Sequence, residues 1–243
     1  MPLRSRAVDM VQIKFDKELV LAQHFLLKHL DREYLRHLAQ SATLASFPRN
    51  RTIFQKGDPG DSMMAVIRGR VKICTHSADG KELVLNIIGN GGLFGEIALL
   101  DGEPRTADAV ALDETDLLVL SRAQFLPTMT ARPDMALRLI AVLCKRLRLT
   151  SEHLEDALLL DVPSRVARAL LRLAEAFGRP AGDAVRIDIK LSQQQIGTLV
   201  GISRESVNKQ LVDWQRDGMI SVESGLITLL DGEGLRAVAA SAM

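Results

Sequence analysis

The chain has 243 residues, of which 47% are hydrophobic and 25% are charged. This composition is typical of a packed globular protein with one large or two modest domains, and it excludes a disordered chain. The 31 basic and 30 acidic residues leave a net charge of +1, so any nucleic-acid surface must be local. No apolar run reaches the length of about 18 residues that a membrane span needs, and no apolar leader core follows Met1. We therefore expect a cytoplasmic protein that does not contact the membrane.

The two cysteines, Cys74 and Cys144, lie in different predicted elements and match no metal-ligand spacing. We expect two buried thiols in a reducing compartment, and no metal site. The chain has a single Trp and a single Tyr, so we do not expect it to bind nucleic acid by stacking bases on aromatic side chains.

The first half of the chain changes from helical to strand periodicity. After a loosely ordered start over residues 1–14, leucines recur at helical spacing over residues 16–40. From residue 45 the hydrophobic period shortens, and glycine-rich turns separate short apolar runs. The predicted strands cover residues 52–54, 63–67, 71–74, 82–88, 107–112 and 115–120. Many short strands of this kind imply an antiparallel β-barrel or jelly roll, whose interior can hold one small ligand.

A glycine-rich segment at residues 91–107 interrupts these strands. Its glycines allow backbone angles and close approaches that other residues avoid. Residues 97–100 can form one helical turn, whose first N–H groups suit an anion. Arg105 can grip phosphate oxygens with two donors, and Glu96 can accept from a ribose hydroxyl. The segment predicts a pocket for a sugar phosphate; a plain turn with an exposed arginine is the alternative.

The run Phe94-Gly-Glu-Ile-Ala-Leu-Leu, followed by Arg105-Thr-Ala107, resembles the phosphate-binding cassette of cyclic-nucleotide-binding domains. Over residues 15–230 the chain resembles the cyclic AMP receptor protein (CRP/FNR) family of bacterial transcription regulators, in its cyclic-nucleotide-binding branch. The resemblance implies cyclic AMP as the ligand, with cyclic GMP as a second possibility, because Thr106 stands where cyclic GMP-binding domains often carry threonine. The implied ligand-binding residues of this segment are Gly95, Glu96, Ile97, Ala98, Arg105 and Thr106.

Within that set, the resemblance implies that Arg105, Thr106 and nearby backbone N–H groups hold the phosphate. Glu96 and the backbone of Gly95 hold the ribose.

A long helix is predicted over residues 134–160. Residues that are apolar at all but one position step along it by three and four, at Ile140, Leu143, Leu147, Thr150, Leu154 and Ala157. This a/d seam is the pattern of two helices that wind together, and the partner we expect is a second copy of the chain. Packing of the helix on its own barrel is the alternative.

Thr150 is the polar position of the seam, and Ser151 follows it. A threonine there can simply bond to its own helix. In the resembled family the motif Arg-Leu-x-x-Thr-Ser-Glu carries hydroxyls that reach adenine, one from each subunit. Here the motif reads Arg146-Leu-Arg-Leu-Thr-Ser-Glu152, which implies that Thr150 and Ser151 read the base.

Pro163 ends this helix, because proline is disfavoured inside helices and restricts the residue before it. A helix over residues 164–177, a loop over residues 178–182 and a strand over residues 185–189 follow. The predicted organisation is α+β, with a cyclic-nucleotide-binding barrel domain at residues 1–133, a dimerisation helix at 134–160 and a winged helix-turn-helix domain at 161–243.

The C-terminal domain contains two helices that meet at a tight turn. Ser192 begins a capping box that is completed by Gln195, Gly201 occupies the turn, and Ser203 can cap a second helix over residues 204–216. A hairpin over residues 219–229 follows, so the pattern is a winged helix whose second helix reads DNA. An ordinary helical hairpin or a protein-binding module has the same outline.

The run Gly201-Ile-Ser-Arg-Glu-Ser-Val207 resembles the start of the family's recognition helix. Arg204 can hold guanine with two bonds and Glu205 can accept from cytosine N4. Lys209 stands where the activator of the family has arginine, and it lacks the guanidinium fork. Ser192, Gln193 and Asn208 are candidate phosphate contacts. The full DNA-binding set is Ser192, Gln193, Ser203, Arg204, Glu205, Asn208 and Lys209.

Together these features predict a homodimeric, cyclic-nucleotide-dependent transcription regulator that binds double-stranded DNA at a palindromic TGTGA-like operator. RNA polymerase is a partner implied by the resemblance alone. The alternatives are a relative that senses haem or carbon monoxide through His76, and a cyclic-nucleotide-binding adaptor without DNA binding. We expect no enzymatic activity, because no metal-ligand set, nucleophile–base pair or P-loop accompanies the cassette.

Overall fold

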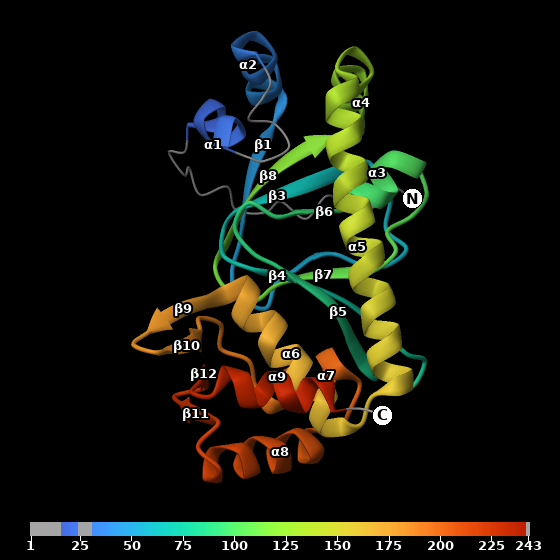
Figure 1. The fold of residues 1–243 in the computed structure, drawn as a ribbon. Coiled ribbons are helices and arrows are strands. Elements are labelled where there is room, and N and C mark those ends of the chain that lie inside the picture. Colours follow the sequence, from blue (N-terminus) through green and yellow to red (C-terminus); the bar gives the residue numbers. More distant parts are fainter. Residues whose placement is uncertain (1–15, 24–30, 242–243) are drawn as a thin grey trace. The chain divides into compact units, whose positions relative to one another are not determined.

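The computed structural model describes residues 16–23 and 31–241, and its elements are shown in Figure 1. The chain divides into two compact units, the first made of residues 1–75 and 86–145 and the second of residues 76–85 and 146–243. The predicted loose start over residues 1–14 and the part of the predicted helical stretch at residues 24–30 lie outside the described residues. Helices α1 (Lys17–Gln23) and α2 (Arg32–Ser41) confirm the rest of that stretch.

The strands up to β8 form two four-stranded sheets. The first has the order β1 (Thr43–Phe47), β8 (Thr115–Ser121), β3 (Ser62–Arg68) and β6 (Leu93–Phe94). The second has the order β2 (Thr52–Phe54), β7 (Asp108–Ala111), β4 (Val71–His76) and β5 (Glu82–Ile88). The predicted antiparallel jelly roll is confirmed. Closure into a barrel is wrong, because the hydrogen-bonded ladders of the described residues form two separate sheets.

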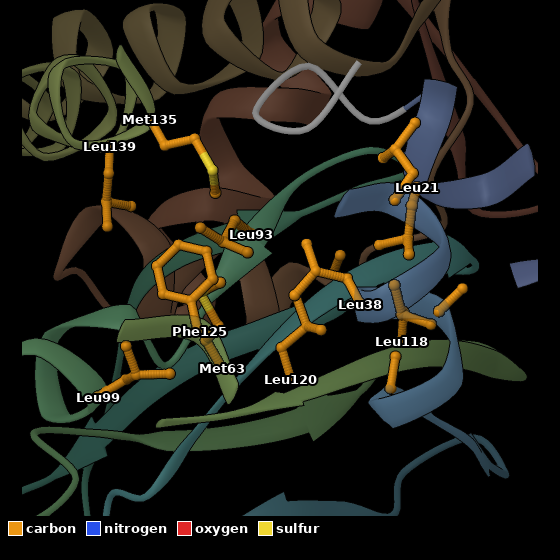
Figure 2. Close-up of a cluster of buried hydrophobic side chains, with 14 residues drawn as sticks. Leu21, Leu38, Met63, Leu93, Leu99, Leu118, Leu120, Phe125, Met135 and Leu139 are labelled. Carbon is orange, nitrogen blue, oxygen red and sulfur yellow. The ribbon is translucent and has the colours of Figure 1, made fainter. Parts of the chain in front are cut away.

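Successive side chains of β3 point to opposite faces of the sheet, and so they contribute to two separate hydrophobic cores. Met64 and Val66 join the cluster inside the sandwich, which takes residues from both sheets. Met63 and Ala65 point to the other face of the first sheet, where α1, α2, α4 (Arg122–Ala131) and the start of α5 pack. Figure 2 shows Phe125 of α4 within this second cluster. Each such buried Leu, Met or Phe side chain contributes about 1.5–3 kcal/mol to stability.

Helix α5 (Pro133–Leu159) confirms the predicted long helix to within one residue at each end. It begins at a proline, which fits the first turn because its missing N–H has no partner there anyway. Large apolar side chains on α5 are 52–73% exposed in the single chain, at Leu137, Ile140, Leu147, Leu154, Leu158 and Leu159. The prediction of two buried cysteines holds for Cys74 and is wrong for Cys144, which is on the exposed side of α5.

The long helix ends close to the predicted position, and residues 160 and 161 separate α5 from the next helix. The side chain of Asp161 accepts a hydrogen bond from the backbone N–H of Ser164 at 3.0 Å, and so caps α6 (Val162–Phe177). Hydrogen bonding from the side chain and then from the backbone N–H of Ser164 lowers the pKa of the Asp161 carboxyl. Helix α9 (Gly232–Ala240) packs on α6, where Ser164 Oγ donates to Val238 O at 2.9 Å.

The second unit contains one more four-stranded sheet, of order β11 (Ile220–Glu223), β12 (Leu226–Leu229), β10 (Ala184–Ile187) and β9 (Gly178–Ala181). The predicted hairpin is thereby confirmed, and so is most of the predicted strand at 185–189. The predicted loop at 178–182 is wrong, because residues 178–181 pair with β10. Pro180 misled the prediction: a proline is tolerated in an edge strand, where β9 lies.

A buried carboxylate ties the end of α5 to α6. Asp156 is 4% exposed and accepts from Arg168 Nη1 and Arg172 Nη2, each at 2.7 Å. Arg168 Nε also donates to Ala239 O of α9 at 3.2 Å. His153, one turn earlier on α5, is half-buried; burial lowers the pKa of its imidazole, and the positive charge of Arg172 acts in the same direction.

His153 predicts an acid-sensitive contribution to stability. Because folding lowers its pKa, the unfolded chain binds the proton more readily, so the free energy of unfolding falls as pH drops below about 6.5. In urea unfolding measured at a series of pH values, H153Q should show a flatter dependence between about pH 5 and 6.5. Replacement of the exposed His37 by Gln is the control. Equal slopes for H153Q and the unmodified protein would contradict this.

Candidate functional site

Glycines shape the start of α3 (Glu96–Asp101) in the predicted cassette. Gly95 caps this helix with φ +79°, in the left-handed region that favours glycine. A Cβ atom on Gly95 would lie 2.7 Å from Arg105 Nη1. Gly60 also matters, since its Cβ would lie 2.1 Å from Ala98 Cβ. The sequence indicated only a turn at Gly60, because its contact with α3 comes from a distant part of the chain.

Arg105 is the centre of the cassette, and only 4% of it is exposed. Its Nη1 donates to Gly95 O at 2.8 Å and its Nη2 donates to Ser62 Oγ at 2.9 Å. Its Cζ lies 4.3 Å from the centre of the Phe54 ring, in cation–π contact. Ser62 and Phe54 were not predicted, since nothing local marks a serine or a phenylalanine on another strand as a partner of Arg105.

The charge of Arg105 is not neutralised by an ion pair within the described residues. Burial lowers the pKa of its guanidinium, while the more distant carboxylates of Asp61, Asp58 and Glu96 act against that shift. Its Nε has no hydrogen-bond partner among the residues described. A buried cation that lacks a close counter-charge favours binding of an anion beside it.

The other predicted residues of the cassette lie at the start of α3 or next to Arg105 in the chain. Glu96 and Ala98 are buried in α3, Ile97 is 39% exposed, and Thr106 is exposed beside Arg105 in the chain. The structure thus brings Gly95, Glu96 and Arg105 together. Thr150 and Ser151 lie at exposed positions of α5 and belong to the second compact unit.

The predicted helix-turn-helix is present in the second unit. Ser192 accepts from the Gln195 N–H at 3.1 Å, and the reciprocal bond of the capping box is formed at the start of α7 (Gln193–Val200). Gly201 ends α7 with φ +71°, as left-handed C-caps require. Ser203 accepts from the Ser206 N–H at 3.1 Å and caps α8 (Arg204–Arg216). Local sequence signals therefore determine both helix starts and the turn.

One exposed face of α8 carries the predicted base-reading residues. Arg204, Glu205, Asn208 and Lys209 are all exposed, and their spacing places them on neighbouring turns of one side. Hydrogen bonds from its own backbone N–H and from the Ser203 side chain lower the pKa of the Glu205 carboxyl. Glu205 is therefore an ionised acceptor at neutral pH, while Arg204 and Lys209 are donors.

Gln193 joins the two helices of the motif. Its Nε2 donates to Asn208 Oδ1 at 2.7 Å, so these two predicted phosphate contacts lie side by side. They border a hollow of about 200 Å³ between α7, α8 and the β11–β12 hairpin, whose lining includes Val212, Gln215 and Gly225. Val212 and Gln215 were not predicted as part of this surface, although Val212 follows Asn208 by one helical turn.

Neither a metal-ligand cluster nor a membrane-spanning helix is found in the described part of the chain. Within residues 16–23 and 31–241, no cluster of three or more His, Cys, Asp or Glu side chains could hold a metal ion. None of the helices there combines the length and the hydropathy that crossing a bilayer requires.

Two family models match the chain. Residues 44–132 match the cyclic nucleotide-binding domain, and residues 164–238 match the Crp-like helix-turn-helix domain. The first match contains the cassette around Arg105, and the second contains α7, α8 and the β11–β12 hairpin.

Similar proteins of known role are bacterial regulators. The CRP-like cAMP-activated global transcriptional regulator of Mycobacterium tuberculosis is 37% identical over 216 residues, which cover 89% of this chain and 96% of that protein. The cAMP-activated global transcriptional regulator CRP of Escherichia coli is 30% identical over 187 residues, covering 75% of this chain and 87% of that protein.

Solved structures agree on the fold. FixK2 from Bradyrhizobium japonicum superposes with a TM-score of 0.75 at 22% identity, covering 83% of this chain and 99% of that chain. A CRP/FNR-family transcriptional regulator from Thermus thermophilus superposes with a TM-score of 0.67 at 29% identity, covering 83% of this chain and 100% of that chain. With both domain models matched and relatives aligned over most of its length, the chain belongs to the CRP/FNR family of bacterial transcription regulators.

Proposed function

We propose that this regulator is a cytoplasmic homodimer that binds a cyclic nucleotide and, in that state, binds a palindromic TGTGA-like operator. Cyclic AMP is the preferred ligand and cyclic GMP the alternative. RNA polymerase is the partner that the family implies. Relatives from Mycobacterium tuberculosis and Escherichia coli are named as cAMP-activated regulators, which supports cyclic AMP as first choice.

The buried guanidinium of Arg105 is the observation that carries the ligand proposal. Gly95 O and Ser62 Oγ hold it in place, and no carboxylate of the described residues pairs with it. The cyclic phosphate of the nucleotide supplies the missing counter-charge, helped by Thr106 and by the backbone N–H groups of Ile97 and Ala98. The carboxylate of Glu96 and the backbone of Gly95 take the ribose.

The exposed seam of α5 supports the dimer. Side chains such as Leu147 and Leu154 are 68% and 60% exposed in the single chain, and an apolar stripe of this kind on a long helix fits a second copy of itself. Thr150 and Ser151 on this seam read the base. A nucleotide that binds one arrangement of the paired helices more tightly shifts the protein toward that arrangement.

The exposed face of α8 supports the DNA proposal. Two donors, Arg204 and Lys209, flank one ionised acceptor, Glu205, which suits guanine and cytosine edges in the major groove. The twofold axis of the dimer requires a palindromic site with half-sites about 34 Å apart.

Loss of the buried guanidinium should weaken nucleotide binding. In R105Q the phosphate of the nucleotide loses a positively charged group that can donate two hydrogen bonds to it. The dissociation constant for cyclic AMP, measured by titration calorimetry, should therefore rise about 100-fold. The exposed Arg49, changed to Gln, removes the same charge elsewhere and should leave the constant unchanged. A folded R105Q protein with wild-type affinity would contradict the proposed site.

The glycine that caps α3 should be as important as the arginine. G95A places a methyl group 2.7 Å from Arg105 Nη1, so the guanidinium must move and affinity for cyclic AMP should fall about tenfold. Gly91 offers a matched control, because its φ of +74° brings the same backbone strain but nothing lies within 4 Å of its Cβ. Equal nucleotide affinities for G95A and G91A would show that the guanidinium position does not matter.

Charges placed in the α5 seam should separate the dimer. L147D and L154D each place a carboxylate in a stripe that must be desolvated on pairing, so dimer dissociation should be favoured by several kcal/mol. Sedimentation equilibrium measures the result, with the exposed Glu155 changed to Asp as control. A double variant L147D/L154D that stays dimeric at micromolar concentration would rule out this interface.

Arg204 should be responsible for the preference for guanine at one position of each half-site. R204A should weaken binding to the operator by about 1–3 kcal/mol and relax the preference for guanine at one position. Fluorescence anisotropy at fixed salt, on the operator and on duplexes with single base-pair changes, measures both effects. R236Q removes the same charge from α9 and should leave base preference intact. An R204A protein with unchanged preference at every position would overturn the assignment.

A further inference from the structure

Helix α5 presents two different faces in its last turns. Leu154, Leu158 and Leu159 are 60–73% exposed, whereas Asp156, between them in sequence, is 4% exposed. Two residues along a helix turn the side-chain direction by about 200°, so Asp156 lies on the side away from seam residue Leu154. The end of α5 therefore has an apolar stripe on one side and a buried charge on the other.

The buried face is attached to the DNA-binding part of the chain. The two oxygens of Asp156 each accept from a different arginine of α6, Oδ1 from Arg168 and Oδ2 from Arg172. Both contacts are 2.7 Å long, which is typical of charge-assisted bonds. Arg168 continues the connection to the carbonyl of Ala239 in α9.

Helix α6 also contacts the other helices of the winged-helix domain. It packs against α9 through Ser164, and it is in contact with α7 and α8. Residues 146–243 all belong to the compact second unit, so the turn with Thr150 and Ser151 lies in the same unit as the recognition helix. The break at Asp161 is therefore spanned by the ion pairs of Asp156.

We propose that Asp156 is a positioning residue that transmits rotation of the nucleotide-contacting turns of α5 to α6, and through α6 to the recognition helix. The inference rests on the proposed cyclic-nucleotide gate. Without the two ion pairs, α5 can rotate while α6 stays behind, because the chain between them consists of the non-helical residues 160 and 161. Asp156 touches neither nucleotide nor DNA in this scheme.

We define coupling as the ratio of the operator dissociation constant without cyclic AMP to that with saturating cyclic AMP. Fluorescence anisotropy on the full-length protein measures both constants. D156N keeps the shape of the side chain and removes its charge, and the coupling ratio should fall about fivefold or more. D156E keeps the charge and should retain most of the coupling. E155Q changes the charge of the neighbouring exposed residue and should behave as wild type.

A second measurement separates coupling from simple stability. By linkage, the effect of operator DNA on the affinity for cyclic AMP must fall by the same factor as the effect of cyclic AMP on the affinity for DNA. Substitution of a residue that only stabilises the fold lowers the melting temperature and leaves both ratios unchanged. If D156N fails to fold, the partly exposed Arg172 offers R172Q, for which we expect a fall of about twofold to threefold.

The outcomes are distinguishable. Reduced coupling in folded D156N or R172Q, in both directions and with E155Q normal, supports the inference. Wild-type coupling in these variants overturns it and leaves the proposed function standing. Absence of any cyclic AMP effect on the wild-type protein overturns the proposed function itself, and this inference with it.

Discussion

The first unit is organised around a buried positive charge. Arg105 reaches in from the segment before β7, and three distant parts of the chain hold it: Gly95 at the start of α3, Ser62 of β3 and Phe54 of β2. Burying a guanidinium without a paired carboxylate costs free energy. Binding of an anion beside Arg105 would lower that cost. The two sheets and their apolar cores provide the rigid frame, and the glycines at 60 and 95 provide the room.

In our proposal, the second unit passes a change from the long helix α5 to the surface that binds DNA. Helix α5 exposes an apolar seam and buries Asp156, and α6 carries both arginines that bind this carboxylate. The capped helices α7 and α8 then present Arg204, Glu205 and Lys209 on one exposed face. Family membership explains why both units occur in one chain.

Features determined by local chemistry were predictable. The capping box at Ser192, the left-handed turn at Gly201 and the helix break after α5 follow from side-chain and backbone rules that act over a few residues. Contacts between distant segments were not predictable: nothing near Ser62 or Phe54 marks them as partners of Arg105, and Asp156 looks like one more acid on an exposed helix. The strand at 178–181 was missed because Pro180 is compatible with an edge strand as well as with a loop. Two separate sheets instead of a closed barrel depend on pairing that single-strand patterns do not specify.

The central claim is that nucleotide binding changes DNA binding. The most direct test is the affinity of the full-length protein for a palindromic TGTGA-type duplex, measured by anisotropy at one stated salt concentration, without nucleotide and with saturating cyclic AMP or cyclic GMP. We predict that cyclic AMP tightens operator binding by about tenfold or more, and does so more strongly than cyclic GMP. Equal operator affinity in all three conditions would contradict the claim.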